Sequence, residues 1–121
     1  MAKLDHVGVA VRSIAQARRL YETLGLSVLE EQEDNDVRSV MIPLGESQLH
    51  LQELGKGEGL HHLAIHVDDI SAAFESLKRA GIALLSDEIE IGNGGRLHFQ
   101  VNPAAANGVL LEICQDPISA V

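Results

Sequence analysis

Histidines recur in this chain at positions where they could bind a metal ion. His6 and His62 lie 56 positions apart, each inside a segment that alternates aliphatic with small or polar residues. Such alternation predicts a β-strand with two different faces. The aliphatic side chains form the face that packs in the core. Each histidine falls on the opposite face, and polar imidazoles are uncommon in a packed core. Taken singly, each histidine is expected to be a half-buried, hydrogen-bonded residue of a sheet, so a metal site requires further ligands at matching positions.

The same spacing extends beyond the histidines and indicates an internal repeat. Ile14 and Ile70 are also 56 positions apart, and the interval grows to 62 in the last strand of each copy, where Glu112 corresponds to His50. Symmetry thus selects four residues at two pairs of matching positions: His6, His62, His50 and Glu112. Three imidazoles and one carboxylate suit a divalent first-row transition metal and leave coordination positions for water or substrate.

The elements that must position these residues form two β-α-β-β-β copies. In the first copy we predict strands over 4–11, 26–29, 37–44 and 48–54, and a helix that begins at a capping box formed by Ser13 and Gln16. We assign repeat one to 1–54, a flexible linker to 55–59 and repeat two to 60–115, all within a single domain of 1–121. The expected fold class is α+β, in which the two repeats pair into a curved eight-stranded cavity with the helices outside.

Composition narrows the classes of function. The 18 acidic residues exceed the 9 basic ones and leave a net charge of −9, which argues against binding to nucleic acid or to an anionic membrane surface. One cysteine excludes an internal disulfide and fits a reducing compartment. No apolar run reaches membrane-spanning length, so we expect a cytoplasmic protein without a membrane partner.

Three segments resemble the vicinal oxygen chelate superfamily, and most of all its methylmalonyl-CoA epimerases. They are the first strand Leu4-Asp5-His6-Val7-Gly8-Val9-Ala10-Val11, the double-histidine segment Gly59-Leu60-His61-His62-Leu63-Ala64, and the last strand Gly108-Val109-Leu110-Leu111-Glu112. The likeness covers nearly the whole chain. His50 stands where the family usually has Gln or Glu, and the five-residue linker is shorter than in epimerases of this type.

The resemblance implies a site and a cofactor. The metal ligands would be His6, His50, His62 and Glu112, with Glu112 also serving as the catalytic base, and the ion would be cobalt, nickel, zinc, manganese or iron. Aligned with the second carboxylate of some epimerases, Arg38 is expected to hold a substrate carboxylate or phosphate. From the strand patterns we add His66, His98 and Gln100 as candidate substrate-binding residues. His61, which points toward the aliphatic face or the sheet edge, is interpreted as structural, and Cys114 as a small packing residue.

The implied reaction is proton abstraction α to a carbonyl, with a metal-stabilised enolate. A metal-dependent isomerase acting on a small-molecule substrate such as an acyl-CoA is the first hypothesis. The alternatives are a glyoxalase I-like lyase acting on a hemithioacetal and a non-catalytic small-molecule-binding protein of the bleomycin-resistance type. An extradiol dioxygenase fits less well, because its iron site leaves free the position that His50 takes here. Superfamily members commonly form dimers, so we expect a homodimer.

Overall fold

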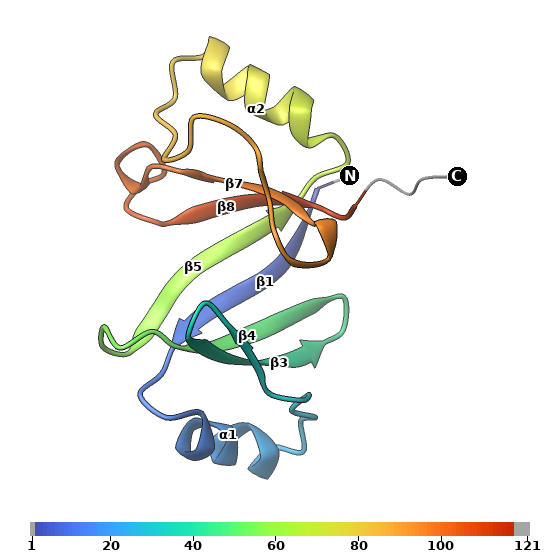
Figure 1. Cartoon of the computed structure of the whole chain (residues 1–121), viewed down its shortest axis with the longest axis vertical. Coiled ribbons are helices and arrows are strands. Elements are labelled where there is room, and N and C mark those ends of the chain that lie inside the picture. Colours follow the sequence, from blue (N-terminus) through green and yellow to red (C-terminus); the bar gives the residue numbers. More distant parts are fainter. Residues whose placement is uncertain (1, 118–121) are drawn as a thin grey trace. The chain divides into compact units, whose positions relative to one another are not determined.

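The computed structural model describes residues 2–117, which form eight β-strands, two α-helices and two short 3-10 helices (Figure 1). In chain order these elements are β1 (Lys3–Ala10), α1 (Ile14–Thr23), β2 (Gln32–Asp34), β3 (Val37–Leu44), β4 (Ser47–Glu53), β5 (Gly59–His66), α2 (Ile70–Arg79), β6 (Glu90–Ile91), η1 (Asn93–Gly95), β7 (Leu97–Val101), η2 (Pro103–Ala105) and β8 (Leu111–Gln115). Within the described residues, no helix is both long enough and apolar enough to cross a membrane.

The chain divides into two compact units. One unit comprises residues 6–62, and the other comprises residues 1–5 together with 63–121. Strands β1 and β5 each begin in one unit and end in the other. The first residues of β1 therefore belong to the unit that contains 63–121, and the first residues of β5 belong to the 6–62 unit. The predicted repeat boundaries do not show this.

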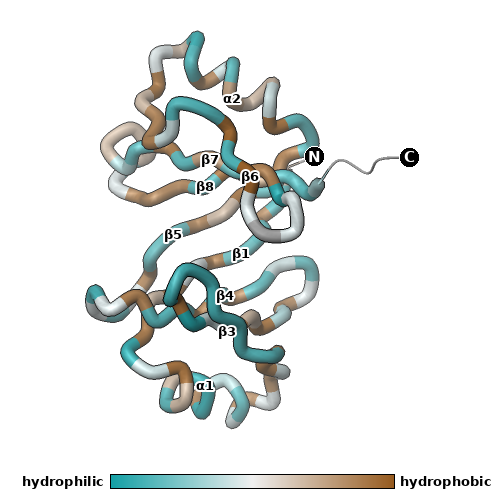
Figure 2. Tube along the Cα trace, viewed as in Figure 1, coloured by the Kyte–Doolittle hydropathy of each residue, from teal (hydrophilic) through white to brown (hydrophobic). Residues whose placement is uncertain are grey.

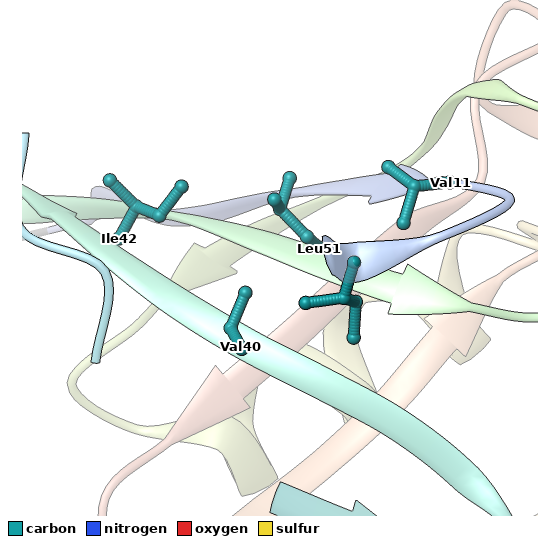
Figure 3. Close-up of a cluster of buried hydrophobic side chains, with 5 residues drawn as sticks. Val11, Val40, Ile42 and Leu51 are labelled. Carbon is teal, nitrogen blue, oxygen red and sulfur yellow. The ribbon is translucent and has the colours of Figure 1, made fainter. Parts of the chain in front are cut away.

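In the 6–62 unit, the strands follow the order β2-β3-β4-β1, in which β1 and β4 are parallel and the other neighbours antiparallel. One face of these strands packs with α1 around five buried apolar residues, Val11, Ile14, Val40, Ile42 and Leu51. Figure 3 labels four of these side chains: Val40 and Ile42 from β3, Leu51 from β4, and Val11 just after β1. Because this core occupies the helix-facing side, His6 and His50 lie on the opposite face.

The second unit repeats this plan with β5, β8, β7 and β6, where β5 and β8 are parallel. Its core also lies beneath a helix, and comprises Ile70, Phe74, Phe99, Val101 and Ile113. In Figure 2 apolar and polar positions alternate along both helices, as expected for helices with one buried side. The two β-α-β-β-β repeats are thus present, although the strand predicted at 26–29 is displaced.

The N-termini of both helices are fixed in the same way. Ser13 and Asp69 act as N-caps, and their side chains accept hydrogen bonds from the third helical residue. A second acceptor comes from the last residue of the last strand in each repeat. Glu53 Oε2 accepts the first helical N–H of α1 at 2.8 Å, and Gln115 Oε1 does the same for α2 at 2.7 Å. Each helix is therefore tied to the last strand of its repeat, which carries His50 in the first repeat and Glu112 in the second.

The strand predicted at 26–29 is wrong. That segment forms one recorded backbone hydrogen bond to β3, from Leu29 N to Met41 O, and the short strand β2 follows three residues later. The physical reason is the tight turn between β2 and β3, where Asn35 and Asp36 both have positive φ values of 51° and 65°. This turn sets the register of β2 against β3. The strand pairing therefore forms in the polar segment Gln32–Asp34 rather than in the apolar segment 26–29.

Candidate metal centre and active site

Three histidines of the 6–62 unit converge at one point. His6 comes from β1, His50 from β4 and His62 from β5, and one nitrogen of each ring lies within 4.8 Å of the others. His6 Nε2 and His62 Nε2 are 2.9 Å apart, and their rings meet edge to face. The ring centroids of His6 and His50 are 5.5 Å apart. We call these three residues the histidine triad.

The spacing of the triad fits a metal ion. Two nitrogens bound to one ion at about 2.1 Å and at right angles lie about 3.0 Å from each other. The 2.9 Å between the Nε2 atoms of His6 and His62 matches that arrangement. The same distance also fits one N–H donated from ring to ring. Neutral imidazoles are preferred ligands of first-row transition metals, so the triad is a donor set that could hold such an ion.

The electrostatic surroundings keep two of the triad histidines, His50 and His62, in a metal-binding form. Burial, helped by the neighbouring His6, lowers the pKa of His50 to about 4. Burial also lowers the pKa of His62 to about 4, with contributions from His6, His61 and His50. Both rings are therefore neutral at pH 7, and each has a free lone pair on one nitrogen. A metal ion does not have to displace a second proton from either ring.

Gly8 makes room for the ring of His62. A Cβ atom at Gly8 would lie 2.1 Å from Cε1, 2.3 Å from Nδ1 and 2.8 Å from Nε2 of His62. These distances are far below normal contact, so the ring occupies the space that a side chain at residue 8 would need. The equivalent position in the second repeat carries Ala64. The glycine is thus required by the triad rather than by the strand.

One polar atom on the face of the triad has no hydrogen-bond partner among the described residues. It is the buried Oε1 of Gln52, which lies on β4 two residues after His50 and pairs with Ser39 of β3. Gln52 shares the face of His50 because alternate residues of a strand point the same way. Sequence patterning places Gln52 on this face, but only the structure shows that its carbonyl oxygen is buried without a hydrogen-bond partner.

Four other predicted site residues, His66, His98, Gln100 and Glu112, lie together in the second unit. The register pairs Glu112 with Gln100 and with Ala64, and pairs Cys114 with His98 and with His66. His66, His98, Gln100 and Glu112 therefore share one face of the strands. His98 Nδ1 lies 3.7 Å from Glu112 Oε1. The role of Glu112 as a fourth ligand stays a prediction.

Arg38 lies on the wrong face for the role expected of it. Along β3, Arg38 alternates with Ser39 and shares the helix-facing side of Val40, whereas Met41 pairs with His50 on the opposite face. The guanidinium forms ion pairs with Glu31 and with Glu53, whose Oε2 accepts the first helical N–H of α1. In this register Arg38 and His50 lie on opposite faces, because successive residues of a strand point to opposite sides.

A second ionic cluster was missed by sequence reasoning. The guanidinium of Arg96 donates two hydrogen bonds to the buried carboxylate of Asp5, 91 residues away, and a third to Cys114 Sγ at 3.4 Å. Burial raises the pKa of Cys114 to about 12. The thiol is therefore protonated and unreactive, in agreement with a packing role. No local sequence signal connects Asp5 with Arg96.

A scan against protein-family models matches residues 5–99 to the Glyoxalase/Bleomycin resistance protein/Dioxygenase superfamily. The chain belongs to this superfamily. The fold class expected from the sequence and the family resemblance are both confirmed by this match and by the solved structures that the chain resembles.

Several proteins similar to this chain are methylmalonyl-CoA epimerases. The mitochondrial methylmalonyl-CoA epimerase of Mus musculus is 35% identical over 95% of this chain and 74% of its own length. The ethylmalonyl-CoA/methylmalonyl-CoA epimerase of Cereibacter sphaeroides is 33% identical over 95% of this chain and 98% of its own. A solved methylmalonyl-CoA epimerase in complex with methylmalonyl-CoA and NH4+ has a TM-score of 0.84 at 27% identity, covering 96% of this chain and 95% of the other.

Proposed function

We propose that this protein is a metal-dependent isomerase of the methylmalonyl-CoA epimerase type, acting on a small acyl-CoA. The observation that carries the proposal is the histidine triad, which is preformed in a chain similar to methylmalonyl-CoA epimerases over 95% of its length. A solved relative contains methylmalonyl-CoA, which supports the substrate class. Isomerases of this kind remove and return a proton at the carbon next to a carbonyl.

Each residue has a distinct part in this proposal. His6, His50 and His62 would hold a divalent ion of cobalt, nickel, zinc, manganese or iron. The ion would polarise the carbonyl oxygen of the bound substrate as a Lewis acid. Glu112 would accept the α-proton, and His98, 3.7 Å from it, would help to orient the carboxylate. His66, Gln100 and Gln52 would line the substrate site.

The proposal is tested by proton exchange at the α-carbon. Metal-loaded protein in deuterated water should introduce deuterium into methylmalonyl-CoA, as followed by mass spectrometry, and elemental analysis should identify the ion. Glu112→Gln keeps an oxygen that can bind metal but removes the base, and should slow exchange by at least about 100-fold. Gln16→Glu on the exposed side of α1 serves as a surface control. Absence of exchange by the metal-loaded wild type rules out this substrate.

One observation favours a second candidate, a glyoxalase I-like lyase. In the 6–62 unit, strands β1, β3 and β4 carry no carboxylate on the face of the triad, where β3 presents Val37, Ser39, Met41 and Pro43. Inverting a stereocentre requires a proton donor on each side of the substrate, whereas a single carboxylate can move a proton between adjacent carbons of a hemithioacetal. Turnover of methylglyoxal together with a thiol would identify the lyase. Tight drug binding without turnover would identify the non-catalytic, bleomycin-resistance type of protein.

Two further predictions accompany this function. We propose that the protein acts as a homodimer in the cytoplasm, as expected from the family resemblance and from the single cysteine. Sedimentation of the metal-loaded protein tests whether it is a homodimer.

A further inference from the structure

His61 contacts one of the three triad histidines, although the alternation of β5 directs it away from them. His61 Nδ1 lies 2.8 Å from Nδ1 of His62, and the two rings meet edge to face with centroids 5.1 Å apart. The other nitrogen of His62, Nε2, faces His6 Nε2 at 2.9 Å. Both ring nitrogens of His62 are therefore in contact with another imidazole, one on each side.

The proton count of His62 makes this contact important. A neutral imidazole carries one N–H, so only one of its two nitrogens has a lone pair available. Nε2 of His62 can bind a metal only if the proton is on Nδ1. A half-buried Nδ1–H needs an acceptor, and His61 Nδ1 is the acceptor within hydrogen-bond distance. His61 is exposed, so its own Nε2–H can be solvated by water.

We infer that His61 is a positioning residue that holds His62 in the Nδ1–H tautomer, leaving Nε2 bare for a divalent transition metal. The inference rests on the metal site of the proposed function. It assigns a role to a residue that strand alternation alone makes structural. Metal-binding histidines commonly have such a partner on the second nitrogen, and loss of the partner costs about 10-fold to 100-fold in metal affinity. In this chain the partner is a second histidine, adjacent in sequence.

The opposite proton arrangement has different consequences. If His62 carried its proton on Nε2 and donated it to His6, His61 would act as the donor to His62 Nδ1. The proton would then have to leave Nε2 before a metal could bind there. The two arrangements differ in which nitrogen of His62 is protonated, which long-range ¹H–¹⁵N spectra of the imidazole ring report directly.

Two acceptor-free variants and one rescue variant test the inference. His61→Phe and His61→Ala remove the acceptor at an exposed position, whereas His61→Gln supplies a carbonyl oxygen in its place. We expect Co²⁺ affinity, measured by calorimetry, to fall about 10-fold to 100-fold in the first two and to return to within about threefold of wild type in the third. Leu60→Phe, at a neighbouring position that is 81% exposed, is the control for changes in the local strand and should bind Co²⁺ normally.

The tautomer of His62 gives a readout that does not depend on metal or on activity. In the metal-free wild type, Nδ1 of His62 should be the protonated nitrogen, and in His61→Phe the proton should move to Nε2, where His6 accepts it. Protonation of Nε2 in the wild type, or wild-type Co²⁺ affinity in both acceptor-free variants, would overturn the inference. If the wild type binds no Co²⁺, the proposed metal dependence fails, while the spectra of the metal-free protein still decide the role of His61.

Discussion

Gly8→Ala is the substitution that tests the geometry of the triad most directly. The new Cβ would lie 2.1 Å from Cε1 of His62, and normal contacts between carbon atoms begin near about 3.5 Å, so the ring must retreat by about 1.4 Å. Coordination distances tolerate changes of only about 0.2 Å. The retreat therefore removes His62 from the ligand set. Backbone strain does not contribute, because Gly8 is not among the glycines with positive φ.

Two magnitudes follow from this displacement. Metal affinity should fall by at least about 100-fold, the upper end of what a misplaced ligand partner costs. The free energy of unfolding of the metal-free protein should fall by about 1–3 kcal/mol, as for other overpacked sites. Co²⁺ titration calorimetry measures the first quantity and urea denaturation without metal measures the second.

A double-mutant cycle with His62→Ala separates the clash from other effects. In the His62→Ala background the ring is gone, so adding Gly8→Ala should change the urea midpoint very little. The equivalent strand position in the second repeat carries the fully buried Ala64, which shows that this place in the repeat accepts a Cβ. The predicted clash with the His62 ring is wrong if Gly8→Ala binds Co²⁺ within threefold of wild type. It is also wrong if Gly8→Ala destabilises the wild type and His62→Ala equally.

Four further outcomes are expected. Because folding lowers the pKa values of His50 and His62 from 6.5 to about 4, the unfolded chain binds more protons between these values. The metal-free protein should therefore lose stability as pH falls from 6.5 toward 4. The free energy of unfolding should fall by up to about 1.4 kcal/mol per pH unit for His50, and by less for the more exposed His62. His50→Gln should flatten the pH dependence of the urea midpoint. Arg38→Gln should leave KM for the acyl-CoA within about twofold, since Arg38 lies on the helix-facing side; a tenfold rise would contradict the register argument. Glu53→Leu should cost about 1–2 kcal/mol in the free energy of unfolding, because the first N–H of α1 loses its acceptor, whereas Glu53→Gln should cost less. Cys114 should not react with Ellman's reagent in the native protein and should react fully in guanidinium, and rapid native labelling would show that the thiol is accessible.

Short periodicities in the sequence predict the repeat, the faces of the histidine strands and the start of α1. They are the alternation of two along a strand and the three-residue reach of Ser13 to the N–H group of Gln16. For that reason His6, His50 and His62 could be selected before any coordinates were known. The same reasoning predicted Glu112 as a fourth ligand, which stays a prediction.

Contacts between distant segments determine which of these groups come close enough to act together. The turn at Asn35 and Asp36 set the register of β2, and the register of β3 placed Arg38 on the helix-facing side. The contact between His61 and His62 depends on side-chain directions that alternation does not describe. The pairing of Asp5 with Arg96 joins residues 91 positions apart. Such contacts arise from packing between distant segments, and no local pattern in the sequence encodes them.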